Sequence, residues 1–146
     1  MAIAHCVLEI ETEAAICVCN ITHQLQALLS TTGIQNGQML VFSRHTTMAL
    51  AVNEDEVRLF ADIETWLKKL APPTDSYLHN DLHLRENIPP DEPRNAHAHL
   101  MAMLLSYSEV VPVIDGYLGL GTYQSVLLLE LDGPRKRTVG CQIMGE

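Results

Sequence analysis

The sequence predicts an α+β fold in a single domain, with antiparallel or mixed β-sheets packed against about three helices. Three observations support this prediction. Strand-like segments lie towards both ends of the chain, three segments have helical spacing, and an Asp115-Gly116 turn joins apolar stretches. Strands and helices do not alternate regularly, which disfavours a parallel α/β design. A chain of 146 residues has the length of one domain, so residues 1–146 are expected to share one fold.

The first elements are expected to be two strands and a helix. Residues 2–11 alternate apolar and polar side chains imperfectly, and residues 16–21 form a short apolar run, so both predict strands. The following leucines have helical spacing, with Asn20 or Thr22 as a possible N-cap and Gly33 as the C-terminal stop. The first helix is therefore expected just after the second strand.

A polar island, Arg44–Thr47, interrupts the otherwise strand-like residues 38–53. Residues 54–70 then carry apolar side chains at every third or fourth position, which predicts an amphipathic helix that ends before a pair of prolines. The acids Asp55 and Glu56 are interpreted as capping groups and favourable charges at the start of this helix.

The connection from Pro72 to Asn95 is long for a small domain and contains His79 and His83. Connections of this length are commonly functional. The apolar neighbours of both histidines predict that the connection packs against the body of the protein. A helix over residues 96–105 is expected to follow, with Asn95 as its N-cap.

The C-terminal third predicts an antiparallel meander. Its strands are expected at residues 109–114, 117–118, 122–131 and 138–144. Turn residues separate them, including Asp-Gly after the first strand and Asp-Gly-Pro before the last.

Composition and charge exclude several classes of function. Eighteen acidic and nine basic residues leave a net charge of −9, which opposes nucleic-acid binding. The basic cluster Arg135-Lys136-Arg137 is interpreted as a solvated hairpin end or as protection of an edge strand. No apolar run is long enough for a membrane span, and the N-terminus does not have the pattern of a secretory signal. A soluble, cytoplasmic protein with four free thiols is expected.

Histidines are the most informative residues for function. The chain has seven, and five of them lie between His45 and His99. These five come from three expected elements: His45 from a strand junction, His79 and His83 from the long connection, and His97 and His99 from the start of a helix. Three imidazoles from different elements with an open position are typical of a catalytic zinc site. His97 and His99 diverge by about 200° on a helix, so one ion is not expected to bind both. A set of separately hydrogen-bonded histidines remains the alternative, because no short ligand motif is present.

Two further groups of residues have open interpretations. Asn53 and Glu54 precede the amphipathic helix, where a carboxylate could act as a general base or support a metal ligand. Residues 119–125 combine glycines with hydroxyl and amide side chains, which suits an anionic ligand or a bulge in a sheet.

Five groups of residues occur in the order found in a known family. They are His45-Thr46-Thr47 with Asn53-Glu54; Tyr77 with His79-Asn80-Asp81; Asn95-Ala96-His97-Ala98-His99-Leu100; Gly121-Thr122-Tyr123-Gln124; and Asp132-Gly133-Pro134-Arg135 with Gly145-Glu146. On these residues the chain resembles the YjbQ family, also known as the secondary thiamine-phosphate synthase family, over almost its entire length.

The resemblance implies a homotrimer with histidine-lined pockets near the subunit interfaces. It makes His45, His79 and His99 the expected ligands of a divalent metal ion such as zinc, with His97 in reserve and His83 a weaker candidate. The catalytic candidates are Glu54, Asn53 and Asp81. The substrate-binding candidates are Thr46, Thr47, Gly121, Thr122, Gln124 and His97. The chain departs from the family at Tyr123, where tryptophan is frequent, and at Met101, where lysine is frequent.

The expected function is a metal-dependent enzyme that acts on a small phosphorylated or otherwise anionic molecule. The family name implies a thiamine-phosphate synthase type of transferase reaction as a weak side activity. The alternative is a non-catalytic, trimeric accessory protein that binds a metal ion or an anion. A fold alone does not decide between them.

Overall fold

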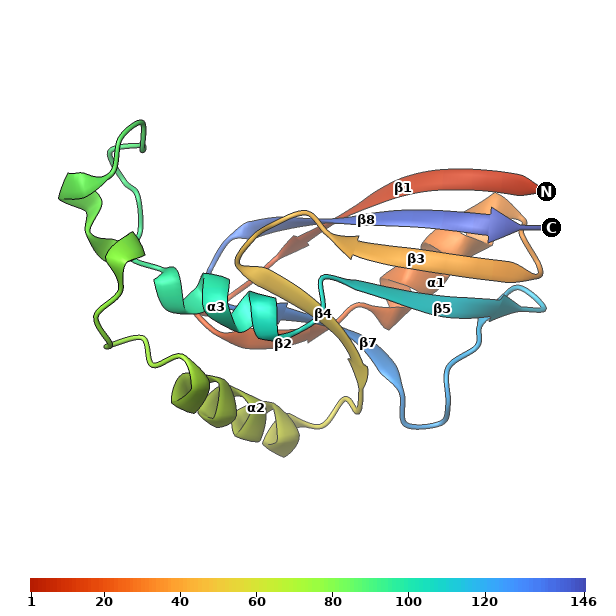
Figure 1. Ribbon diagram of the computed structural model, residues 1–146. Helices are drawn as coiled ribbons and strands as arrows, with labels where there is room; N and C mark the ends of the chain where they lie inside the picture. Colours follow the sequence, from red (N-terminus) through yellow and green to blue (C-terminus); the bar gives the residue numbers. More distant parts are fainter.

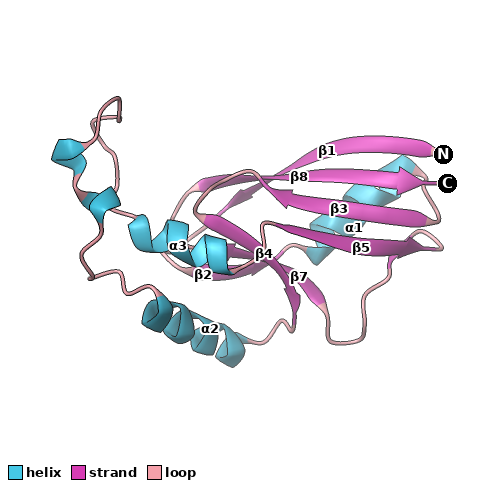
Figure 2. Ribbon diagram, viewed as in Figure 1, coloured by secondary structure: helices cyan, strands magenta, loops and turns pink.

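Two antiparallel sheets and three α-helices make up the computed structural model, which describes all 146 residues (Figure 1; Figure 2). The strands are β1 (Ala2–Glu11), β2 (Cys17–Asn20), β3 (Gly37–Ser43), β4 (Met48–Asn53), β5 (Ser108–Ile114), β6 (Tyr117–Leu118), β7 (Ser125–Glu130) and β8 (Lys136–Gly145). The α-helices are α1 (Thr22–Thr32), α2 (Val57–Leu70) and α3 (Ala96–Leu104). This architecture confirms the predicted α+β class.

The larger sheet has the strand order β1-β8-β3-β5-β6, and the smaller sheet has the order β2-β7-β4. The last strand therefore lies between the first and the third, and it pairs with β1 from Ala2–Gly145 to Glu11–Lys136. The predicted C-terminal meander is wrong, because β7 and β8 belong to different sheets. Local turn signals identified the strands, but distant partners determine their pairing.

The core is built around β7, whose apolar residues are buried on both faces. Val126 and Leu128 belong to a cluster with α1 and the inner face of the larger sheet, whereas Leu127 and Leu129 belong to a cluster with α2 and α3. Complete burial of each leucine contributes about 1.5–3 kcal/mol. The smaller sheet is thus a middle layer, and the outer face of the larger sheet has no helix over it (Figure 1).

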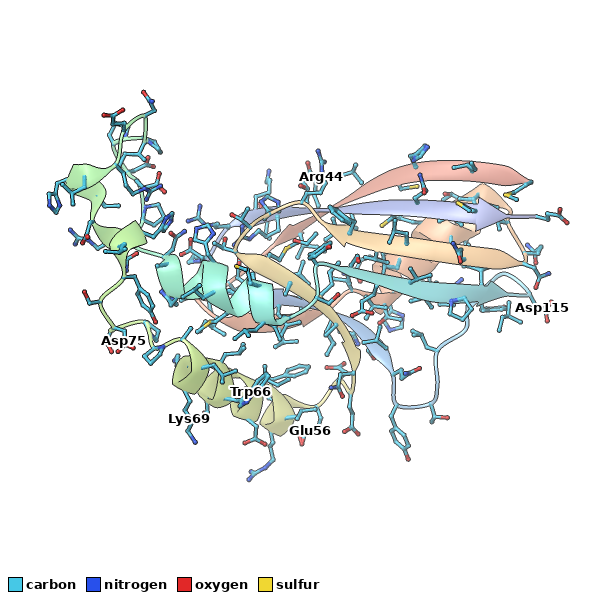
Figure 3. All side chains as sticks on the ribbon, in the orientation of Figure 1. Arg44, Glu56, Trp66, Lys69, Asp75 and Asp115 are labelled. Atoms are coloured by element: carbon cyan, nitrogen blue, oxygen red, sulfur yellow. The ribbon has the colours of Figure 1, made fainter.

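The helix starts show which predicted caps form. Glu56 is the N-cap of α2, and its carboxylate accepts hydrogen bonds from the amides of Arg58 and Leu59 (Figure 3). Asn95 precedes α3, but its side chain does not cap the helix. It donates to Asp132 instead. Asn95 therefore occupies the predicted N-cap position, but without a capping hydrogen bond from its side chain.

The long connection before α3 contains two 3-10 turns, Leu78–Asn80 and Leu82–Leu84, and extends from the body (Figure 1). Leu78 is 88% exposed and Leu84 is 73% exposed. The expectation that the apolar neighbours of the two histidines pack against the body is therefore wrong for Leu78 and Leu84, whereas Tyr77 and Leu82 are half-buried. All four cysteines are free thiols, as expected. None of the helices combines the length and the apolar character that crossing a membrane would need.

Candidate functional site

His79 and His99 form a close pair at the junction between the long connection and α3. Their ring centroids are 4.7 Å apart, with an interplanar angle of 76°. His79 lies in the first 3-10 turn, and His99 lies in the first turns of α3. The structure thus brings together two of the three predicted metal ligands, although 20 positions separate them in the sequence.

Three buried side-chain atoms in the long connection and the first turns of α3 have no hydrogen-bond partner. They are Nε2 of His79, Nδ1 of His97 and Oδ1 of Asn95. The large majority of buried side-chain polar atoms in proteins have a partner, so each of these atoms has a hydrogen-bonding or ligand-binding position left open. Imidazole nitrogens suit zinc and related ions. His79 and His99 are therefore candidate ligands whose rings the structure places side by side.

The start of α3 holds this arrangement in place. The side chain of Asn80 accepts a hydrogen bond from the amide of Ala96 over 3.1 Å, so it satisfies one of the unpaired donors at the helix start. Asn80 follows His79 directly, and this bond therefore ties the histidine-bearing turn to α3. The side-chain hydrogen bond at the start of α3 thus comes from Asn80 and not from Asn95.

His45 and His99 line one cavity of about 680 Å³. The β3–β4 connection supplies the polar part of the wall, including Arg44 and Thr46. Its other residues are Phe42, Ser43, Met48, Ala102, Met103 and Tyr107. The rings of Phe42 and Tyr107 meet edge to face, with centroids 5.6 Å apart. The cavity therefore has a polar, cationic part and an apolar, partly aromatic part.

A hydrogen bond from β8 orients His45. The amide of Thr138 donates to Nε2 of His45 over 2.9 Å, and the Thr138 hydroxyl lies 3.1 Å from the same nitrogen. Ser43 supports the same connection, because its hydroxyl lies 3.1 Å from the carbonyl oxygen of His45. The ring is therefore held before any ligand binds.

A buried ion pair lies beneath the same connection. Arg137 is 3% exposed and Glu130 is 0% exposed, and Nε of Arg137 donates to both carboxylate oxygens. Arg137 also donates to the carbonyl and hydroxyl oxygens of Thr47. The interpretation of residues 135–137 as a solvated hairpin end is thus wrong for Arg137. Glu130 directly follows the apolar residues of β7, and this is the sequence feature that could have indicated a buried charge at the end of the strand.

Burial favours the neutral form of three histidines in this region. It is the main reason that the pKa values of His45, His97 and His99 lie below the ordinary value. The positive charge of Arg137 lowers the pKa of His45 further, and proximity to His79 lowers that of His99. Neutral imidazoles are the form that binds metal ions and accepts or donates one hydrogen bond at each nitrogen.

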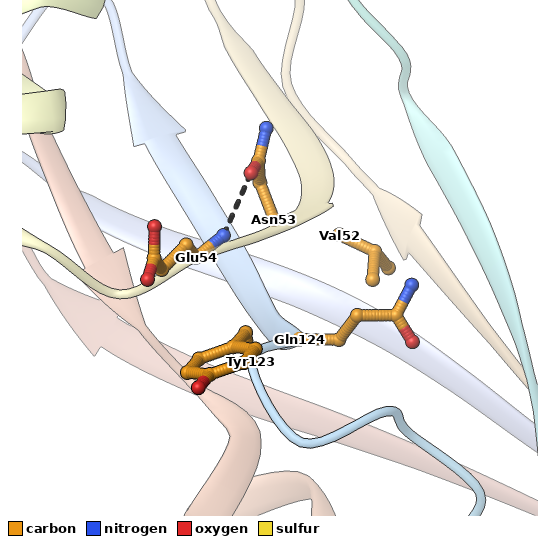
Figure 4. Close-up of a pocket in the computed structure, with 5 residues that line it drawn as sticks. All are labelled: Val52, Asn53, Glu54, Tyr123 and Gln124. Carbon is orange, nitrogen blue, oxygen red and sulfur yellow. Dashed lines mark hydrogen bonds between the residues drawn. The ribbon is translucent and has the colours of Figure 1, made fainter.

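A second cleft, of about 400 Å³, lies at the other end of β4 (Figure 4). Asn53, Glu54, Tyr123 and Gln124 line it together with Val52. The amide of Glu54 donates to the side chain of Asn53, and the side chain of Gln124 accepts from the amide of Gly121. The predicted catalytic residues Asn53 and Glu54 thus meet predicted substrate-binding residues, but not the histidines.

The predicted site is therefore divided within one chain. β4 has six residues and spans about 20 Å between the two ends that carry His45 and Glu54. No three histidine, cysteine, aspartate or glutamate side chains of one chain come together in a way that could hold a metal ion. His45, His79 and His99 therefore do not form such a group within the chain. Nε2 of His45 is bonded to the amide of Thr138.

The remaining predicted residues have distinct surroundings. Thr47 is 5% exposed and bonded to Arg137, so it supports the connection and is not free to bind a substrate. Thr122 is exposed in the loop beside the second cleft, and Asp81 is half-buried between the two 3-10 turns. Met101 is fully buried in the core cluster of α2 and α3. This departure from the family therefore changes a packing position in this chain.

Comparisons with known proteins agree with this architecture. A family model described as "UPF0047 protein YjbQ-like" matches residues 7–146. A UPF0047 protein of Methanothermobacter thermautotrophicus is 40% identical over 139 residues, which cover 95% of this chain and 90% of the relative. The UPF0047 protein YugU of Bacillus subtilis is 31% identical, with 94% and 97% covered.

Solved structures show the same fold. The crystal structure of a hypothetical protein from Aeropyrum pernix K1 has 38% sequence identity and a TM-score of 0.88, and the match covers 98% of this chain and 99% of that one. A YbjQ-like protein of unknown function from Sulfolobus solfataricus has 36% identity and a TM-score of 0.89, with 99% of both chains covered.

Proposed function

The chain belongs to the YjbQ (UPF0047) family, and on this premise we propose that it is a metal-dependent enzyme that acts on a small phosphorylated or otherwise anionic molecule. The pair of His79 and His99 carries the proposal, because Nε2 of His79 is buried without a partner and the two rings lie 4.7 Å apart. His79 and His99 hold the divalent ion, which neutralises negative charge on the substrate when it is bound.

Two acids are available for proton transfer. Asp81 follows His79 by two residues and is half-buried. It is therefore an acid near the histidine pair that belongs to the same chain. Glu54 lies in the second cleft, at the far end of β4. It takes part in the reaction only if a second copy of the chain brings its cleft to the histidines.

The uncovered face of the larger sheet supports assembly into a homotrimer. Five apolar side chains on its strands are exposed: Ile3, Val7, Phe42, Val110 and Ile114. Exposed apolar patches on a protein surface commonly mark interaction sites. Phe42 also lines the histidine cavity, so a subunit on this face borders the cavity. The complete site then forms near a subunit interface.

The division of the site favours a second candidate function. In a single chain neither Glu54 nor Asn53 shares a cleft with the histidines. A non-catalytic accessory protein that binds a metal ion or an anion needs only the histidine cavity. Measurement of turnover separates the two functions.

Metal analysis of the purified protein tests the ion. We expect about one divalent ion per chain, and loss of this ion in His79→Ala and His99→Ala. His83→Ala is the matched control, because His83 lies in the same connection and is exposed. Negligible metal in the wild type after incubation with zinc, or equal metal in wild type and His79→Ala, would refute the ligand assignment.

Activity needs a separate experiment. Wild type and His79→Ala are screened against phosphorylated metabolites, and a pyrimidine pyrophosphate with a thiazole phosphate is included for the synthase reaction. Loss of turnover in a folded variant supports the enzyme. Metal binding without turnover on any substrate favours the accessory protein.

The assembly is tested by light scattering coupled to size exclusion. We expect three times the 16.2 kDa mass of one chain for the wild type and a smaller mass for Val110→Glu. A monomeric wild type would remove the trimer from the proposal and leave Glu54 without a route to the histidines.

A further inference from the structure

The backbone fixes the hydrogen-bond role of one nitrogen in the histidine cavity. Thr138 donates its amide hydrogen to Nε2 of His45 over 2.9 Å. A backbone N–H is only a donor, so Nε2 has to be the acceptor. A neutral imidazole carries one proton, and in His45 that proton is therefore on Nδ1, which makes no hydrogen bond within the chain.

From this geometry we propose, on the basis of the function proposed above, that His45 is not a ligand of the metal ion. Its Nδ1–H donates a hydrogen bond to the anionic group of the ligand, and that ligand carries an apolar or aromatic body. His79 and His99 remain the metal ligands. The assignment divides the predicted set of three histidines into two chemical roles.

Coordination of a metal by His45 conflicts with its surroundings. Nδ1 could coordinate an ion only after losing its proton, and the neutral ring would then carry the proton on Nε2. That proton would face the Thr138 amide hydrogen at a nitrogen–nitrogen distance of 2.9 Å. Two donors cannot share one bond, so coordination would break the contact that orients the ring.

The surroundings of His45 suit an anion. Arg44 and Thr46 line the same cavity and come from the same short connection. A guanidinium binds phosphate and carboxylate groups through strong, charge-assisted hydrogen bonds. The pKa of His45 lies below its ordinary value because of burial, so the ring is a neutral donor at pH 7. Charge for the anion then comes from Arg44 and the metal ion.

The rest of the cavity defines the body of the ligand. Phe42, Met103 and Tyr107 line it with apolar and aromatic surface, and its volume of about 680 Å³ exceeds that of an inorganic anion. Aromatic rings prefer offset or edge-on contacts with other rings, as Phe42 and Tyr107 make with each other. A planar, phosphorylated molecule therefore matches both parts of the wall.

The connection is also rigid enough to act as a receptor. Ser43 bonds to the carbonyl oxygen of His45, and Arg137 bonds to both oxygens of Thr47. Thr138 fixes the ring itself. Groups that are already oriented lose little conformational entropy when a ligand binds.

Nuclear magnetic resonance of the histidine ring nitrogens tests the tautomer directly. In the wild-type protein at pH 8 we expect His45 with its proton on Nδ1. Addition of zinc shifts the nitrogens of His79 and His99, whereas the Nε2 resonance of His45 keeps its acceptor character. A proton on Nε2 of His45, or direct zinc coordination at His45, would overturn the inference.

A pair of variants tests the donor, with phenyl phosphate as the probe in zinc-loaded protein. His45→Gln places its amide near the former Nε2 and loses the donor at Nδ1, so we expect about tenfold weaker binding or more. His45→Asn retains an N–H near Nδ1 and is expected to bind within about threefold of wild type. Both variants should retain zinc. Equal phenyl phosphate affinity in His45→Gln and wild type would refute the assignment.

Different outcomes of these experiments would refute the proposed ligand class and the proposed metal-dependent function. Inorganic phosphate is expected to bind more weakly than phenyl phosphate, and equal affinities would refute the apolar body. Loss of zinc in His45→Gln would refute this inference while His79 and His99 stand. Absence of zinc from every variant, with phenyl phosphate still weakened by His45→Gln, would refute the metal-dependent function and support the anion site.

Discussion

The β3–β4 connection and the connection from Pro72 to Asn95 both carry a histidine to the candidate site, but the protein holds them differently. The short one is fixed by hydrogen bonds to β8 and by a buried ion pair. The hydrogen bonds of the long one are mostly internal, such as the bond from Arg85 to the carbonyl oxygen of His79. Asn80 provides its tie to α3.

The difference indicates two strategies for placing a functional side chain. His45 has a fixed ring orientation that is part of the fold. The position of His79 depends on the contact between its 3-10 turn and α3. A metal ion shared with His99 would strengthen that contact. We therefore expect the short connection to lose order only with global unfolding, and the long one to respond to the ion.

The largest effect is expected from Arg137→Met, which removes one partner of the buried pair and leaves Glu130 uncompensated. Removal of one partner of a buried ion pair costs about 3–5 kcal/mol. The free energy of unfolding, measured with urea, should fall by this amount. The double variant Glu130→Gln/Arg137→Met should recover a substantial part of the loss. A change below about 1 kcal/mol would show that the short connection is not fixed by this pair.

The next largest effect on the free energy of unfolding is expected from zinc, which should stabilise the long connection. At a free concentration of 100 times its dissociation constant, an ion that binds only the folded state raises the free energy of unfolding by about 2.7 kcal/mol. Hydrogen exchange should slow at residues 72–95 and change little at residues 44–47. His99→Ala should lose both responses. Equal slowing of hydrogen exchange in both connections by zinc would contradict the proposed difference between them.

Asn80→Ala removes the bond between the long connection and the start of α3. Loss of a side-chain cap costs about 1 kcal/mol. Zinc affinity should fall as well, because the bond positions the neighbouring His79 on α3. Ser76→Ala is a control in the same connection, since Ser76 is exposed. Unchanged zinc affinity in Asn80→Ala would show that the His79–His99 pair does not depend on this tie.

The smallest effect is the pH dependence that comes from His45. Burial and the charges of Arg137, Arg44 and Arg135 lower its pKa from 6.5, while Glu130 opposes them. The unfolded chain therefore binds more protons than the folded protein below about pH 6.5, and stability falls as the pH falls. In thermal unfolding at pH 5 and pH 8, His45→Gln should lose less stability than the wild type. An identical loss would show that protonation of His45 is not linked to folding.

The sequence was most informative where the structural signal is local. The alternation of residues 2–11 matches β1, and the helical period identified α2, although the helix begins at Val57 and not at residue 54. The position of β8 between β1 and β3 could not be predicted, because antiparallel pairing joins residues 96 to 143 positions apart, from Ser43–Val139 to Ala2–Gly145. Short turns could only suggest that neighbouring strands pair with each other.

The candidate site could likewise be predicted only where its residues are recognisable from the local sequence. Histidine excess and family resemblance selected His79 and His99, which do meet. Spacing did not reveal that Thr138 occupies Nε2 of His45, since a backbone amide leaves no trace in residue type. The burial of Arg137 could not be predicted from the basic cluster. The other two members, Arg135 and Lys136, are exposed, and only the fold buries Arg137.

The pairing of Ala2 with Gly145 has a mechanical consequence. Both chain ends lie at the same end of the antiparallel β1–β8 pair (Figure 1). Tension applied between the termini would load the hydrogen bonds of this pair one after another, as in opening a zipper, and not all at once as in shear. In single-molecule stretching the protein should therefore yield at low force, even though its core opposes unfolding by heat or urea.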